Sequence, residues 1–146
     1  MITEEKLQAL IELAKTKEKR DKYRGRSTWV KRWMLLHLLI GTRLSVKEIT
    51  QLRLRDVKLN CSVNYLITCK GSQILIDEEL ARHIREFVEI KGVRGEPVHE
   101  DAYLMTPILD GKPYSCMGIY NLYRLTLKEA GLPQIKFKDF VMSIKK

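Results

Sequence analysis

Arg43 is the residue of this chain whose position most strongly suggests chemistry. It lies between the apolar run "MLLHLLIG" and Ser45, where one helix is expected to end and another to begin. A guanidinium can bind a phosphate through two parallel hydrogen bonds, and the free N–H groups of a helix start favour an anion. The arginine looks buried, and it could instead cap the carbonyl groups of the preceding helix. The residues alone leave both interpretations open.

Positive charge is concentrated between Lys15 and Trp33, where nine Lys and Arg residues stand against two acidic ones and Tyr23 is interleaved with them. Such a segment can neutralise DNA phosphates and release their counterions, although a solvated helix end has the same composition. The residues that we expect to contact DNA are Lys19, Arg20, Lys22, Arg24, Arg26, Lys31 and Arg32, together with Arg53 and Arg55 further along the chain.

Length and composition indicate one globular domain over residues 1–146, because 45% of the residues are hydrophobic and the chain can bury its own core. The formal net charge of +9 favours a polyanionic partner, and double-stranded DNA is the expected one. The longest apolar run is too short to cross a bilayer, and no leader pattern precedes the first helix. We therefore expect no membrane association and a cytoplasmic protein.

The spacing of histidines, cysteines and glycines in the sequence indicates neither a metal site nor a cofactor site. The histidines are scattered at His37, His83 and His99, and we expect His37 to be a core residue of an apolar helix. Three cysteines fit neither a disulfide framework nor a zinc site, and Cys61 and Cys69 are expected to be small buried residues. Glycines in nucleotide-binding spacing are absent. We expect no metal and no cofactor.

The first three helices are expected around the basic segment and Arg43. Apolar periodicity predicts a helix in "TEEKLQALIELAKTKEKR", and Ser27 or Thr28 is expected to cap a second, nearly all-apolar helix that ends at Gly41. Ser45 and Glu48 form a capping box that opens a third helix, predicted to stop near Arg55.

A small sheet and further helices are expected to follow. "DVKL", "VNYLITCK" and "QILI" are predicted strands of an antiparallel hairpin with Lys70 at its tip. Asp77 opens a helix that ends near Gly92, and a fifth helix in "SCMGIYNLYRLTLKEAGLP" stops at Gly131. A last helix begins in "QIKFKDFVMSIKK", and its apolar residues Phe137, Phe140, Val141 and Ile144 are expected to be exposed. The order predicts a mostly helical α+β domain.

The stretch "LHLLIGTRLSVKEITQLRLRDV" resembles the first box of the tyrosine recombinase (phage integrase) catalytic domain. Residues that supply the family pattern are Gly41, Arg43, Ser45, Glu48, Leu52, Asp56 and Val57. The hairpin "LITCKGSQILI", the helix "DEELARHIREFV" and the segment "YLMTPILDGKPYSCMGIYNLYRLTLKEAGL" follow in the order of that family. The resemblance runs from Thr3 to the C-terminus, and it implies a helical bundle with a small antiparallel β-sheet.

In that family a tyrosine attacks a DNA phosphate, while two arginines, a lysine and a histidine stabilise the charge that develops. The resemblance implies that Arg43 is the first arginine and Lys70 the hairpin lysine. The second box, H-x-x-R, falls on "KFKDFVMS", where Lys138 replaces the histidine and Val141 the second arginine. The nucleophilic tyrosine would come after Lys146, so we expect a domain that lacks this C-terminal segment.

These matches and departures predict a DNA-binding protein of the integrase or site-specific recombinase type, from a phage or another mobile element, that cannot cleave DNA by itself. Arg43, Lys70 and Lys138 would form a vestigial phosphate site rather than the centre of an active enzyme. Two alternatives stay open. One is a recombinase that is active only with residues from a partner recombinase or a second copy, and the other is a protein–protein interaction module on the same fold.

Overall fold

The computed structural model of the chain describes residues 2–59 and 62–144. The chain divides into two compact units, the first formed by Met1–Arg43 and Tyr120–Lys146 and the second by Leu44–Ile119. Each unit has buried apolar residues of its own, among them Met34 and Phe140 in the first and Ile49 and Leu66 in the second.

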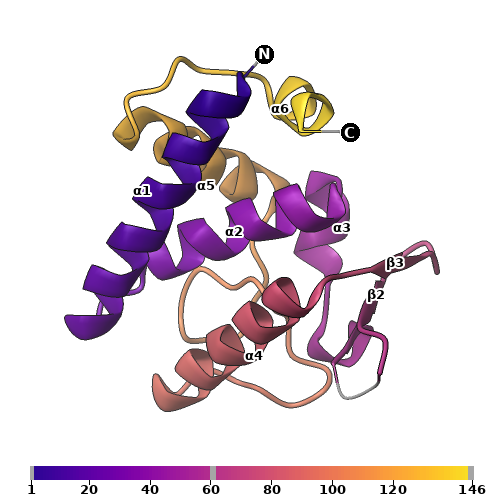
Figure 1. Ribbon diagram of the computed structural model, residues 1–146. Helices are drawn as coiled ribbons and strands as arrows, with labels where there is room; N and C mark the ends of the chain where they lie inside the picture. Colours follow the sequence, from indigo (N-terminus) through magenta and orange to yellow (C-terminus); the bar gives the residue numbers. More distant parts are fainter. Residues whose placement is uncertain (1, 60–61, 145–146) are drawn as a thin grey trace. The chain divides into compact units, whose positions relative to one another are not determined.

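The first unit begins with two long helices, α1 (Glu4–Tyr23) and α2 (Thr28–Thr42), which pack against each other (Figure 1). Thr3 caps α1, since its side chain accepts a hydrogen bond from the N–H of Lys6 at 3.2 Å. Leu10 and Ala14 of α1 are buried, as the apolar periodicity of this helix predicts. The Nζ atoms of two lysines of α1, Lys15 and Lys17, lie over the rings of Trp33 and Trp29 of α2.

Both ends of α2 differ from the prediction. Ser27 occupies the N-cap position, but its side chain makes no capping hydrogen bond. The capping carboxylate belongs to Asp21, whose Oδ2 accepts a hydrogen bond from the N–H of Trp29 at 2.8 Å. The helix does not end at Gly41, because Thr42 is still helical and Arg43 is the C-cap. His37 is buried and stacks on Trp33, so its expected place in the core is confirmed.

The last helices of the chain pack on each other within the first unit. Tyr123 of α5 (Cys116–Glu129) meets the rings of Phe137 and Phe140 of α6 (Phe137–Ser143) edge-on. The hydroxyl of Tyr123 donates a hydrogen bond to the carbonyl oxygen of Ile135 at 2.6 Å. Burial, helped by the charge of Asp139, raises the pKa of this tyrosine above its ordinary value.

The expectation that the last helix exposes its apolar residues is therefore wrong. Phe137, Phe140 and Ile144 are buried, and Val141 is half-buried. The aromatic face of α5 covers Phe137 and Phe140. Tyr123 lies on a different helix, 14 residues before Phe137 in the sequence, so the local sequence of α6 does not predict this contact.

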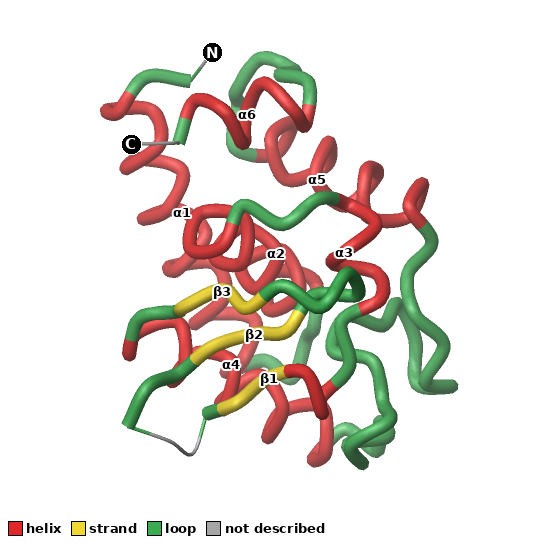
Figure 2. Tube along the Cα trace, turned by 90° about the vertical axis from the view of Figure 1, so that its right-hand side faces the viewer, coloured by secondary structure: helices red, strands yellow, loops and turns green. Residues whose placement is uncertain are grey.

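The second unit begins with α3 (Val46–Gln51) and a short 3-10 turn, η1 (Leu54–Asp56), so the third helix ends before Arg55. A three-stranded antiparallel sheet of order β1-β2-β3 follows, formed by Val57–Lys58, Tyr65–Ile67 and Gln73–Leu75 (Figure 2). Leu66 at its centre pairs with Val57 on one side and Ile74 on the other. The chain then enters α4 (Glu78–Val93), which Asp77 caps as expected.

The fold is a mostly helical α+β architecture with a small antiparallel sheet, as the sequence predicts. The helices of the described residues include none with the length and apolar content of a membrane span.

Candidate nucleic-acid interface

Arg43 closes α2 with an unusual backbone conformation. Its N–H donates to the carbonyl oxygen of Leu39 at 3.0 Å, and its φ of 55° lies in the left-handed region. Among the described residues it is the only one other than glycine with a positive φ. Such a conformation brings Cβ close to the carbonyl oxygen and costs roughly 1–2 kcal/mol outside glycine. The side chain is exposed rather than buried, so the backbone caps the helix while the guanidinium faces solvent.

The helix start that follows needs no ligand to satisfy it. Glu48 Oε1 accepts from the N–H of Ser45 at 2.9 Å, and Ser45 Oγ accepts from the N–H of Glu48 at 3.2 Å. The predicted capping box is thus confirmed, and it accounts for both residues without a functional role.

Lys70 lies in the turn between β2 and β3, as predicted, and its side chain is exposed. Thr68 shapes this turn, because its Oγ1 accepts hydrogen bonds from the N–H groups of Lys70 at 3.3 Å and Ser72 at 3.2 Å. Gly71 supplies the left-handed residue that the turn needs, with a φ of 85°. Cys69 in the same turn is exposed rather than buried, and Cys61 lies outside the described residues.

Arg53 and Arg55 are both held by the segment that follows α4. The guanidinium of Arg53 lies 4.8 Å from the centroid of the Tyr103 ring, and its Nη2 donates to the hydroxyl of Tyr103 at 2.8 Å. Arg55 forms an ion pair with Asp101. Between them, the N–H of Leu54 donates to the carbonyl oxygen of Ala102 at 2.8 Å. These two arginines are therefore positioned by contacts that the sequence did not predict.

The basic end of α1 and the turn after it carry most of the cations expected to contact DNA. Residues of this group with exposed side chains are Lys19, Arg20, Lys22, Arg24 and Arg26. The two acidic residues at this end of α1, Glu18 and Asp21, are buried. Lys22 lies 3.6 Å from the carboxylate of Glu18, and Lys31 is half-buried. The surface presented to solvent by residues 19–26 is consequently cationic.

Arg32 differs from the other predicted DNA contacts because it is 5% exposed. Its guanidinium lies 4.9 Å from the centroid of the Trp29 ring, and its Nη1 is 3.0 Å from Oε1 of Glu129 on α5. The Arg32 guanidinium beside it lowers the pKa of the Glu129 carboxyl, against a smaller opposing effect of desolvation. These contacts place Arg32 in the packing of α2 against α5, so it does not belong to the exposed cationic surface.

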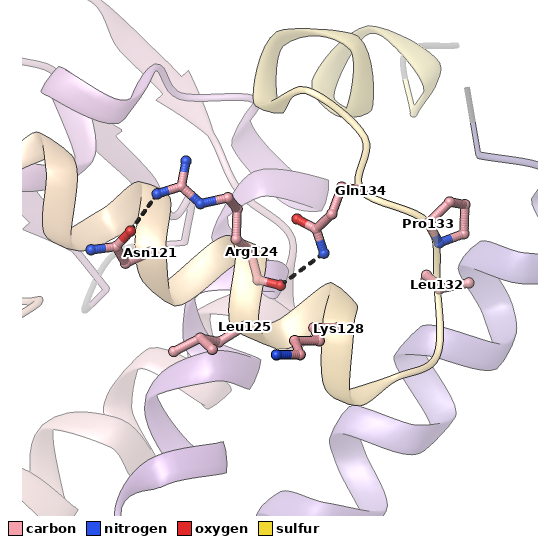
Figure 3. A pocket seen from close by; sticks show the side chains of 7 residues that line it. All are labelled: Asn121, Arg124, Leu125, Lys128, Leu132, Pro133 and Gln134. Carbon is pink, nitrogen blue, oxygen red and sulfur yellow. Dashed lines mark hydrogen bonds between the residues drawn. The ribbon is translucent and has the colours of Figure 1, made fainter.

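Lys138 is exposed at the start of α6. The segment before it is fastened to α5, since Nε2 of Gln134 donates to the carbonyl oxygen of Arg124 at 3.3 Å (Figure 3). A pocket of about 770 Å³ opens beside this contact. Its lining consists of Asn121, Arg124, Leu125, Lys128, Leu132, Pro133 and Gln134 (Figure 3). This hydrogen bond links the loop that precedes Lys138 to α5, whereas the sequence there indicates only the end of a helix.

The second unit contains a buried charged cluster that was not predicted from the sequence. Lys91 Nζ donates to Oε1 of Glu96 at 3.0 Å and to Oγ1 of Thr106 at 2.6 Å, and Thr106 Oγ1 donates to Glu96 Oε1 at 2.6 Å. Lys91 follows Ile84 and Phe87 at helical spacing, so it lies on the apolar face of α4. A lysine at such a position could have indicated a buried charge from the sequence. The cluster ties α4 to the segment that carries Asp101 and Tyr103.

No protein-family model and no curated protein matches this sequence. The structure does match solved ones. One is the crystal structure of XerA recombinase, with a TM-score of 0.73 and 17% identity over 98% of this chain and 48% of that chain. Another is XerH site-specific recombinase bound to its difH substrate in a pre-cleavage complex, with a TM-score of 0.66 and 17% identity over 92% of this chain and 38% of that chain. The chain thus spans less than half of either recombinase, and at this identity the likeness establishes the fold.

Proposed function

We propose that this chain is a DNA-binding domain of the site-specific recombinase type that does not cut DNA by itself. In this proposal both units belong to one integrase-like domain over residues 1–146. The observation that carries it is the exposed cationic run of residues 19–26 on a fold shared with XerA and XerH recombinases. Cations gathered on one surface neutralise phosphates and release counterions, which is the main source of sequence-independent affinity for duplex DNA.

Arg43 and Lys70 support a second set of phosphate contacts. Arg43 keeps a cationic side chain at a backbone position where glycine would be unstrained, and Gly41 lies only two residues away. A strained residue that persists points to a role for its side chain. Lys70 presents its amine from a turn that Thr68 and Gly71 hold in shape. Both cations are exposed, as a contact with a DNA backbone requires.

The identity of residue 141, a valine, is the reason for proposing that the chain does not cleave DNA by itself. Where the resemblance implies the second arginine, Val141 can neither donate a hydrogen bond nor carry charge. Removal of one group that stabilises a developing negative charge typically costs about 10²–10³ in rate. The alternative of a protein–protein module rested on exposed apolar residues of α6, and these are buried or half-buried.

A nicked suicide duplex tests cleavage and binding on the same molecule. The chain alone should retard the labelled duplex on a native gel and leave no covalent adduct on a denaturing gel. A variant with Lys19, Arg20, Arg24 and Arg26 all changed to Gln is the matched control for binding. Adduct formed by the chain alone would refute the proposal, whereas adduct that appears only with an added partner recombinase would support activity in trans.

A further inference from the structure

Tyr23, at the end of α1, is exposed to an extent that is unusual for an aromatic residue. Its exposed fraction is 93%, whereas Tyr123 of the same unit is 1% exposed and packed among aromatic rings. Tyrosine is ordinarily at least partly buried, because its ring is apolar. A ring that stands in water at this position is available to a ligand.

The turn that follows Tyr23 is fixed by hydrogen bonds. Asp21, 5% exposed, accepts the N–H of Trp29 through its side chain at 2.8 Å and the N–H of Arg26 through its carbonyl oxygen at 2.8 Å. Gly25 takes a left-handed φ of 70°, and no atom lies within 4 Å of a Cβ placed there. The end of α1 and the start of α2 are therefore joined by a hydrogen-bonded turn (Figure 1). Tyr23 is the last residue of α1 before this turn.

The charge around Tyr23 is positive on the exposed side. Lys19, Arg20, Arg24 and Arg26 are exposed, and the two acidic residues of this stretch are buried. Glu18 is in addition paired with Lys22. An apolar partner surface would gain nothing from these cations, but a polyanion that also offers a flat apolar face would satisfy both the cations and the ring.

We propose that the end of α1 and the turn after it, residues 19–26, bind an unpaired nucleotide stretch, with the ring of Tyr23 stacked on a base and the surrounding cations on the phosphates. The inference rests on the proposed DNA-binding function and specifies which part of the DNA this turn receives. In a duplex the faces of the bases are covered by their neighbours, and only their edges are open in the grooves. An exposed aromatic ring flanked by cations is the arrangement that single-strand binding proteins use.

Fluorescence anisotropy with an oligo-dT strand and with a blunt duplex of equal length tests the inference. Tyr23→Ala should weaken binding of the single strand about tenfold, as loss of one base–aromatic stack predicts, and should change duplex affinity less than twofold. Tyr23→Phe keeps the ring and should bind both like the wild type. Val93→Ala, which removes an 89% exposed apolar side chain from the second unit, is the matched control and should change neither affinity.

Three results would overturn the inference. The first is a wild type that shows no detectable binding of the single strand, and the second is a Tyr23→Ala variant that lowers the affinity for both DNAs equally or for neither. The third is a Tyr23→Phe variant that loses as much single-strand affinity as Tyr23→Ala does. Failure of the broader proposal looks different, because the wild type would then not bind the duplex at low salt. A wild type that binds the duplex but shows any of the three results leaves the duplex-binding proposal in place.

Discussion

Lys91 Nζ and Glu96 Oε1 lie 3.0 Å apart, with both side chains buried, and the hydroxyl of Thr106 bonds to each of them. This ion pair connects α4 to the segment that holds Arg53 and Arg55 through Tyr103 and Asp101. A charge left in such a place without its partner cannot be solvated, so the pair is costly to break.

We expect Lys91→Met or Glu96→Gln to lower the free energy of unfolding by about 3 kcal/mol, because each leaves one charged or polar group of the cluster buried without its partner. The double variant Lys91→Met/Glu96→Leu should cost less than the sum of its parts. Urea unfolding followed by circular dichroism measures all three. Single variants within about 1 kcal/mol of the wild type would show that the cluster is hydrated in solution.

Arg43→Gly should lower the affinity for duplex DNA without lowering the stability of the fold. Glycine adopts the left-handed conformation without a Cβ clash, so the free energy of unfolding should stay the same or rise by up to about 1 kcal/mol, while duplex DNA binding weakens. Arg43→Val should weaken binding as well, but it should also destabilise the chain because a β-branched residue is strained there. Thermal unfolding and a duplex-binding titration of both variants distinguish these effects. Equal destabilisation by Gly and Val would mean that the arginine side chain stabilises the fold.

Arg32 and Glu129 predict a pH dependence of stability. The pKa of Glu129 is lowered from its ordinary 4.5 in the folded chain, so its contribution is fully present above that pH and is lost as the pH falls through the folded pKa. The difference in unfolding free energy between wild type and Glu129→Gln should therefore shrink from pH 6 to pH 3. Because the Glu129 side chain is 47% exposed, the effect should be small and weaker at high salt. A difference that is constant with pH would contradict the assigned pair.

Tyr103→Phe should release Arg53 while keeping the ring beneath it. The loss of the 2.8 Å hydrogen bond to Arg53 Nη2 should lower the free energy of unfolding by about 1 kcal/mol. If Arg53 contacts DNA from this position, duplex affinity should fall as well, and Arg53→Gln should show no further loss in the Tyr103→Phe background. Additive losses in the double variant, measured by anisotropy, would mean that Tyr103 does not position Arg53 for DNA.

Features set by local chemistry were predictable from the sequence. The capping box of Ser45 and Glu48 and the cap at Asp77 depend on residues within one helical turn. The hairpin with Lys70 in its turn follows from strands rich in β-branched and aromatic residues on either side of a Lys-Gly pair. Each of these signals is complete within about ten residues.

Features that depend on distant partners were not predictable. Arg32 reads as one more cation of a basic run, and only the fold brings Glu129 to it. The end of α2 at Arg43 rather than Gly41 runs against the preference of glycine for this position. Phe137 and Phe140 of α6 are buried because they pack against Tyr123 of α5. The composition of the basic segment could locate a cationic surface, but not which of its members face solvent.

The affinity for a blunt duplex as a function of salt concentration tests the central claim most directly. If Lys19, Arg20, Arg24 and Arg26, four of the five exposed cations of this run, neutralise phosphates, the logarithm of the binding constant should fall with the logarithm of salt with a slope of roughly −4 or steeper. The variant with all four changed to Gln should lose about that much of the slope, whereas Lys6→Gln with Lys112→Gln, two exposed lysines elsewhere, should lose little. No binding at low salt, or an affinity that does not change with salt, would contradict DNA binding by this chain.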